Sequence, residues 1–174
     1  MRSRVVVCLC VLASSCTGQT LTSPSSPAAA SVASAGAVSA ARSATAHALP
    51  FRGSLKAQEV DVLSFPTLKI DGSAEGTATH LGRYAAQFNG AVNVLDGTAT
   101  GSFTFTAANG DQLFATFLGL GVGDPIASIT ETLTITGGTG RFAGASGTLV
   151  VRRTLDLTTG VSSGSLDGSI AMQH

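Results

Sequence analysis

Tryptophan is absent from the chain of 174 residues, tyrosine occurs once, as Tyr84, and only 11% of the residues are charged. Acidic residues are missing from the first 50 positions, since the first of them is Glu59. From Pro50 onward seven bases accompany ten acids, which gives a net charge of −3. A mildly acidic region without a basic stripe offers no electrostatic footprint for phosphates. Nucleic acid is therefore not expected as a partner.

Cysteine is almost as scarce, because all three cysteines lie within the first sixteen residues. The region after Pro50 can form no disulfide, no thiolate metal site and no thiol nucleophile, so burial alone must stabilise it. The three histidines, His47, His80 and His174, share no short spacing, and His80 is typical of a solvated loop residue. We therefore expect no metal site and no cofactor.

The sequence has no apolar run long enough for a membrane-spanning helix. The short apolar run near the N-terminus is typical of a signal peptide. Arg2 and Arg4 precede nine mostly apolar residues, Val5 to Ala13. A permanent membrane-spanning helix needs about 20 such residues. A short apolar run behind a basic start, followed by small residues, predicts a signal peptide over residues 1–15.

Cys16 follows the predicted cleavage point. Residues Leu12 to Cys16 resemble a bacterial lipobox, although Ala13 stands where that pattern usually has leucine. We expect lipidation of Cys16, with plain secretion or a periplasmic location as the alternative. Thr17 stands where an aspartate would retain a lipoprotein in an inner membrane, which favours an outer-membrane anchor. That anchor would be the chain's only attachment to a membrane.

Residues 16–49 differ from the rest of the chain in composition. Positions 17–49 hold eleven alanines and seven serines and no acidic or aromatic residue. The interspersed serine, threonine, glycine and proline interrupt any helical stripe, so this segment is predicted to be a disordered tether.

From Pro50 onward the sequence alternates with a period of two, which indicates half-buried strands. The clearest case is Thr98 to Ala107, where Phe103 and Phe105 fall on one face and threonines on the other, before an Asn109-Gly110 hairpin turn. Similar or less regular strands are predicted elsewhere, at Phe51–Val62, Leu68–His80, Tyr84–Leu95, Asp111–Gly119, Ile126–Thr136, Leu149–Thr158 and Ser163–Ala171. Closure removes unpaired edges, so we predict an all-β fold, one antiparallel barrel of about eight strands over residues 50–174.

Three segments, Thr79–Arg83, Phe105–Asp111 and the glycine-rich Ile135–Gly147, together resemble the allene oxide cyclase and dirigent β-barrels. The resemblance extends from Pro50 to Ile170 and implies a bacterial branch whose members mostly lack an assigned function. The catalytic Glu, Asn, Cys and Tyr set of the plant cyclases has no counterpart here, because the barrel has no cysteine. Other bacterial barrels of this kind catalyse cycloadditions by shaping a substrate, so the missing catalytic set does not exclude an enzyme.

The glycines of the third segment are explained by a tight loop between strands, with Phe142 expected to plug the end of the barrel. A phosphate-binding loop is the alternative, but neither the lysine nor the helix of that motif follows.

Two charged residues interrupt apolar rows that should face the interior. Glu131 is in phase with Leu133, and Arg153 is in phase with Val151. A hairpin centred on Phe142 would place Glu131 opposite Arg153. Three interpretations are open: a buried pair that satisfies itself, a bulge that turns one of the two residues out, or a carboxylate on a pocket floor held by Arg153. Tyr84 is likewise either an amphipathic core residue or a hydrogen-bond donor to a ligand.

The catalytic candidates are therefore Glu131, Arg153 and Tyr84, and no catalytic set is assigned. The expected function is that of an exported lipoprotein-like barrel that binds a small apolar ligand or serves as an interaction module of the cell envelope. An isomerase or cyclase of the allene oxide cyclase type, acting on an apolar substrate in the interior, is the alternative. An open cavity with converging polar groups would favour an enzyme, and a packed interior would exclude one.

Overall fold

The computed structural model describes residues 47–173. The predictions for the signal peptide, for lipidation of Cys16 and for the tether up to residue 46 lie outside this range. Within it, no helix has the length and apolarity that crossing a membrane would require.

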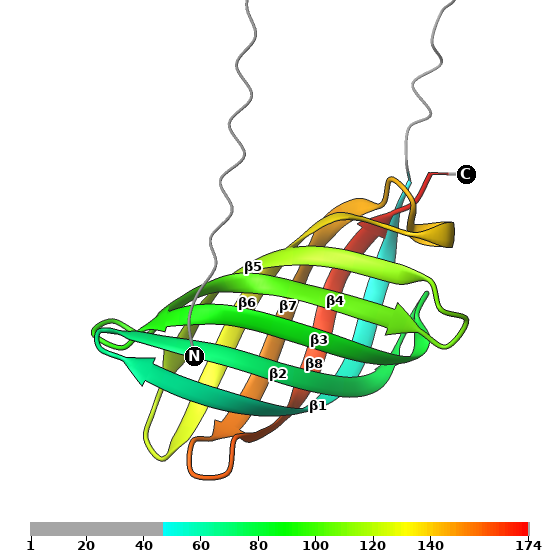
Figure 1. Cartoon of the computed structure of the whole chain (residues 1–174). Coiled ribbons are helices and arrows are strands. Elements are labelled where there is room, and N and C mark those ends of the chain that lie inside the picture. The colour runs from blue at the N-terminus through cyan, green and yellow to red at the C-terminus, as the bar shows by residue number, and fades with distance from the viewer. Residues whose placement is uncertain (1–46, 174) are drawn as a thin grey trace, which may run out of the picture. The chain divides into compact units, whose positions relative to one another are not determined.

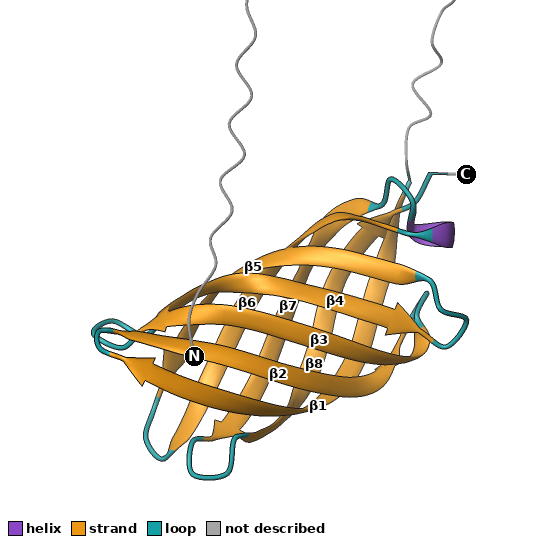
Figure 2. Cartoon of the chain, in the orientation of Figure 1, coloured by secondary structure: helices purple, strands orange, loops and turns teal. Residues whose placement is uncertain are grey.

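The described chain forms a closed barrel in which each strand pairs with the next and β1 pairs with β8 (Figures 1 and 2). All the pairings are antiparallel, as predicted. The strands are β1 (Ala48–Ser64), β2 (Thr67–Ala78), β3 (Gly82–Asn93), β4 (Thr98–Ala107), β5 (Gln112–Val122), β6 (Ile126–Gly138), β7 (Ser146–Asp156) and β8 (Val161–Ala171).

The period-two pattern accounts for most of these elements. The predicted strand Thr98–Ala107 is β4 with the same bounds, and the other predicted strands differ from the observed ones by a few residues. β1 begins at Ala48, two residues before the predicted start of the barrel, because Ala48 pairs with Ala171 of β8. The all-β barrel fold is therefore confirmed.

One end of the barrel is closed. The beginning of β1, the end of β8 and the 3-10 turn η1 (Gly140–Phe142) lie at this end (Figure 1). Phe142, Phe51 and Leu81 are fully or almost fully buried there. Phe142 thus plugs the barrel end as predicted.

An aromatic core fills the adjoining half of the interior. The rings of Phe88 and Phe103 stack with centroids 5.0 Å apart, and Phe105 stacks on Phe103 at 5.4 Å. Gly72 provides the space for Phe88, because a Cβ atom at this position would collide with the Phe88 ring. Inward glycines and aromatic side chains on the neighbouring strand are therefore complementary in shape.

Candidate binding site

The other half of the barrel contains a cavity of about 240 Å³. The turns β1–β2, β3–β4, β5–β6 and β7–β8 lie at this end, opposite η1 (Figure 1). The cavity walls are mainly apolar, with Leu68, Ile70, Val92, Ile129 and Leu155 among them.

Small residues keep this half from being filled. Where the packed half has phenylalanine, the cavity is lined by Gly97, Ala99, Gly121, Gly123 and Ala127. A Cβ atom at Gly121 would meet only Ile129 Cγ1, at 3.7 Å, which is ordinary contact. The cavity therefore arises from the sequence of β4, β5 and β6 and not from a gap between strands.

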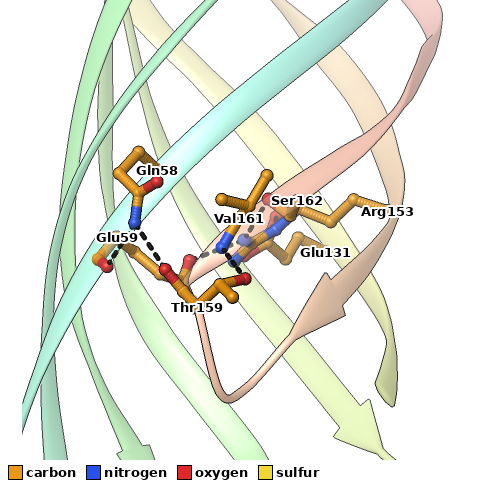
Figure 3. A network of polar contacts seen from close by, with 7 residues as sticks. All are labelled: Gln58, Glu59, Glu131, Arg153, Thr159, Val161 and Ser162. Carbon is orange, nitrogen blue, oxygen red and sulfur yellow. Dashed lines mark hydrogen bonds and ion pairs between the residues drawn. The ribbon is translucent and has the colours of Figure 1, made fainter.

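Arg153 of β7 lines the cavity on the side of the aromatic core, which we call the floor of the cavity. It joins two carboxylates (Figure 3). Its Nη2 and Nε donate to the two carboxylate oxygens of Glu131, at 3.1 and 3.4 Å. Its Nη1 donates to Glu59 Oε2 at 2.6 Å and to Ser162 Oγ at 3.1 Å. Arg153 Cζ also lies over the Phe88 ring, 5.4 Å from its centroid, so the guanidinium group separates the cavity from the aromatic core.

The predicted contact between Glu131 and Arg153 is confirmed, and both are buried, with exposed fractions of 1% and 4%. The predicted register is wrong by two residues. Glu131 is opposite Val151, and Ile129 is opposite Arg153, because the loop containing the η1 turn centres the hairpin on Arg141 and not on Phe142. The two side chains meet diagonally across the strands, which a long arginine side chain permits.

Glu59 and Ser162 also bind Arg153, and neither of them was predicted from the sequence for this site. Glu59 lies on β1, only 5% exposed, and Ser162 lies at the start of β8. The period-two pattern could have indicated that Glu59 faces the interior, since Glu59 is in phase with the buried Leu55 and Ala57. Its partner was not predictable, because Glu59 and Arg153 are 94 residues apart and meet only through closure of the barrel.

Burial and the ion pairs shift the titration of this group. Burial raises the pKa of the Glu59 carboxyl, and the neighbouring Arg153 only partly opposes this. Burial also raises the pKa of Asp61, which lines the cavity on the same strand. Burial alone lowers the pKa of Arg153, but the carboxylates of Glu131 and Glu59 more than reverse this and raise it above its ordinary value.

The structure does not bring Tyr84 into this site. The Tyr84 hydroxyl donates to the carbonyl oxygen of Ser54 at 3.0 Å, and its ring packs edge-on against Phe105. Burial raises the pKa of the hydroxyl, and Tyr84 is not among the residues that line the cavity. The arrangement is that of a core tyrosine with a satisfied hydroxyl.

The turns and strand ends around the cavity mouth carry exposed apolar side chains, which we call the apolar rim. In the described part of the chain, the large exposed apolar residues other than Leu118 all lie in this half, namely Val60, Val62, Leu63, Phe65, Val94, Leu95, Leu120, Val122, Ile126, Leu157 and Val161. Exposed apolar surface gathered in one place is typical of an interaction or ligand-entry surface.

Among residues 47–173, no three side chains of His, Cys, Asp or Glu come together as a metal-binding group. The polar groups at the cavity floor are instead arranged around Arg153.

These features define a small up-and-down β-barrel with one packed end and one open, mainly apolar cavity. No protein-family model matches the sequence, and no curated protein matches it. Among solved structures, the fold is similar to that of the pterocarpan synthase dirigent protein GePTS1, with a TM-score of 0.58, 15% sequence identity, and coverage of 74% of this chain and 89% of that chain. The chain therefore has a dirigent-like eight-stranded barrel fold.

Proposed function

We propose that the barrel binds a small, mostly apolar ligand in the cavity above Arg153. The observation that supports this most directly is an apolar cavity with a few polar groups converging at one point of its floor, which is the usual anatomy of a small-molecule site. The cavity volume of about 240 Å³ is below the ~300–1,000 Å³ common for drug-sized ligands, so the ligand is small.

The two halves of the barrel have different tasks in this proposal. The aromatic core and the polar cluster of Arg153, Glu59, Glu131 and Ser162 form a rigid floor. Each side chain of the polar cluster forms a hydrogen bond with Arg153, and the aromatic rings stack on one another. The apolar wall contributes affinity by burying the body of the ligand, at roughly 25 cal/mol per Å² of apolar surface. The apolar rim offers an entry surface on which an apolar molecule concentrates.

The test is titration of the isotope-labelled protein with 1-octanol, followed by amide resonances. We expect shifts concentrated at Ala99, Gly121 and Ala127. The substitution Gly121→Leu should fill the cavity and abolish these shifts, whereas Thr116→Leu, on the exposed face of the same strand, should leave them intact. Absence of binding to wild type by 1-octanol and by charged molecules with the same octyl chain would reject ligand binding and leave the apolar rim as the surface of an interaction module.

An isomerase or cyclase is the second candidate, and one observation favours it. Glu59 is a buried carboxyl with a raised pKa that borders an apolar cavity, and such a group can transfer a proton to or from a substrate. Mass spectrometry of a captured ligand before and after incubation separates the two functions. Binding alone leaves retention time unchanged, whereas isomerisation changes the retention time at constant mass.

We also propose that the protein is exported, that Cys16 is its lipidated N-terminus, and that it belongs to the bacterial branch of the allene oxide cyclase and dirigent superfamily. The support is the signal-like N-terminus and the glycine-rich segment at Ile135–Gly147. Cell fractionation tests the anchor, since Cys16→Ser should move the protein from the membrane to the soluble fraction. Unchanged fractionation with cleavage at another position would contradict lipidation.

A further inference from the structure

The cavity has an excess of negative charge. Three carboxylates line it, those of Glu59, Asp61 and Glu131, and Arg153 is the only basic residue among the lining residues. The strand ends and turns at its mouth add Asp96, Asp124 and Asp156, and the turns hold no lysine or arginine. A cavity lined by one sign of charge between apolar walls attracts the opposite charge.

The basic group at the floor is already engaged. Arg153 donates two hydrogen bonds to Glu131, one to Glu59 and one to Ser162, which uses four of the five N–H donors that an arginine has. An anionic head group would have to displace a carboxylate from this arrangement or enter beside it. Arg153 therefore compensates only one of the two carboxylates that it contacts, and it is not an anion receptor.

One acceptor of the floor remains open to the cavity. Glu59 Oε2 accepts from Arg153, but within residues 47–173 no hydrogen bond reaches Glu59 Oε1. No fully buried side-chain oxygen or nitrogen of the described residues lacks a partner. Glu59 Oε1 is therefore not fully enclosed, and Glu59 lines the cavity, so this oxygen faces the ligand space.

From this geometry we infer that the ligand is an apolar molecule with an ammonium head group, bound by Glu59 with Asp61 at the entrance. The inference rests on the proposed ligand-binding function and specifies the chemistry of the ligand. A protonated amine donates a charge-assisted hydrogen bond to Glu59 Oε1 and compensates the second carboxylate that Arg153 leaves unbalanced. A hydroxyl donates to the same oxygen without supplying the charge, and a carboxylate does neither.

Three probes with the same apolar body test the inference, namely octylamine, 1-octanol and octanoate, measured by calorimetry on the purified protein at pH 7. We expect octylamine to bind at least about tenfold more tightly than octanol, and octanoate to bind most weakly. Glu59→Gln should reduce the preference for octylamine to within about threefold while retaining octanol binding. Asp71→Asn removes the same charge from the exposed outer face of β2 and should leave the preference unchanged.

The pH dependence provides a second readout. Glu59 faces Asp61 on its own strand, Glu131 on β6 and Arg153 on β7. Burial raises the pKa of Glu59, so at low pH the Glu59 carboxyl is protonated and no longer offers a negative charge to an ammonium group. Octylamine affinity should rise from pH 4 to pH 7, whereas octanol affinity should not.

The outcomes separate the two proposals. Equal binding of octylamine and octanol, or tightest binding of octanoate, would overturn the inference about the head group and leave the ligand-binding function standing. Absence of binding by all three probes would overturn the proposed function itself. A preference for octylamine that Glu59→Gln does not change would also overturn the inference, because the charge would then lie elsewhere.

Discussion

Arg153 is shared by two buried carboxylates, and this sharing changes what each residue contributes. A simple buried pair loses about 3–5 kcal/mol when one partner is removed, because the other charge is left uncompensated. Here Arg153 is the partner of both Glu131 and Glu59, and the side chains of all three residues are no more than 2% exposed. The three residues are therefore not equivalent.

The first prediction concerns this inequality. Arg153→Met should lower the free energy of unfolding by about 3–5 kcal/mol, because two carboxylates lose their cation. Glu131→Gln should cost less, since Arg153 keeps Glu59. Urea denaturation of the single, double and triple variants, including Glu59→Gln, should show strongly non-additive effects, with the triple variant recovering part of the loss. Small and additive effects would mean that these side chains face water in solution.

The second prediction concerns pH. The pKa of Glu59 is raised above its ordinary value of 4.5, so folding favours its protonated form. Its stabilising contribution is complete below the unfolded pKa and is lost as the pH rises through the higher folded pKa. Between pH 4 and pH 8, the stability of wild type relative to Glu59→Gln should therefore fall. Parallel pH profiles of the two proteins would contradict the assignment.

At the scale of the strands, glycines on the inner face have two different roles. Gly72 on β2 makes space for the Phe88 ring, whereas Gly121 on β5 leaves space empty for the cavity. Both are strand glycines on the inner face, yet their surroundings differ. A Cβ atom collides with Phe88 at the first position and meets only ordinary contact at the second.

The third prediction compares these two glycines. Gly72→Ala should destabilise the barrel by about 1–3 kcal/mol, because the added methyl overpacks the aromatic core. Gly121→Ala should be neutral or stabilising by up to about 1 kcal/mol, since it restricts the unfolded chain without strain. Thermal and urea denaturation of both variants is the measurement. Equal losses at the two positions would show that the cavity is filled in solution.

At the scale of the whole molecule, the closed sheet is the unit of stability. β1 pairs with β2 on one side and with β8 on the other, so the first and last described strands complete the barrel together. Phe51 on β1 is fully buried within three residues of the beginning of that strand. Folding therefore depends on the chain from about Ala48 onward.

The fourth prediction follows from this boundary. Deleting residues 17–46 should leave the melting temperature of the barrel unchanged, because that segment contains few large apolar residues and no aromatic residue that could pack on it. A chain beginning at Gly53, which lacks Phe51, serves as the destabilised control. A large drop in melting temperature for the first deletion would show that the segment packs against the barrel.

The sequence alone determined the all-β class, the number of strands within about one, and most strand bounds, because alternation and turn residues are local signals. It also placed Glu131 and Arg153 inside, since both keep the phase of their apolar neighbours. Only the tertiary structure decided that Glu59 joins them and that Tyr84 does not. Those contacts depend on barrel closure and on the register across a glycine-rich loop. The alternation of apolar and polar residues cannot decide between registers that differ by two residues, because both place the same side chains inside.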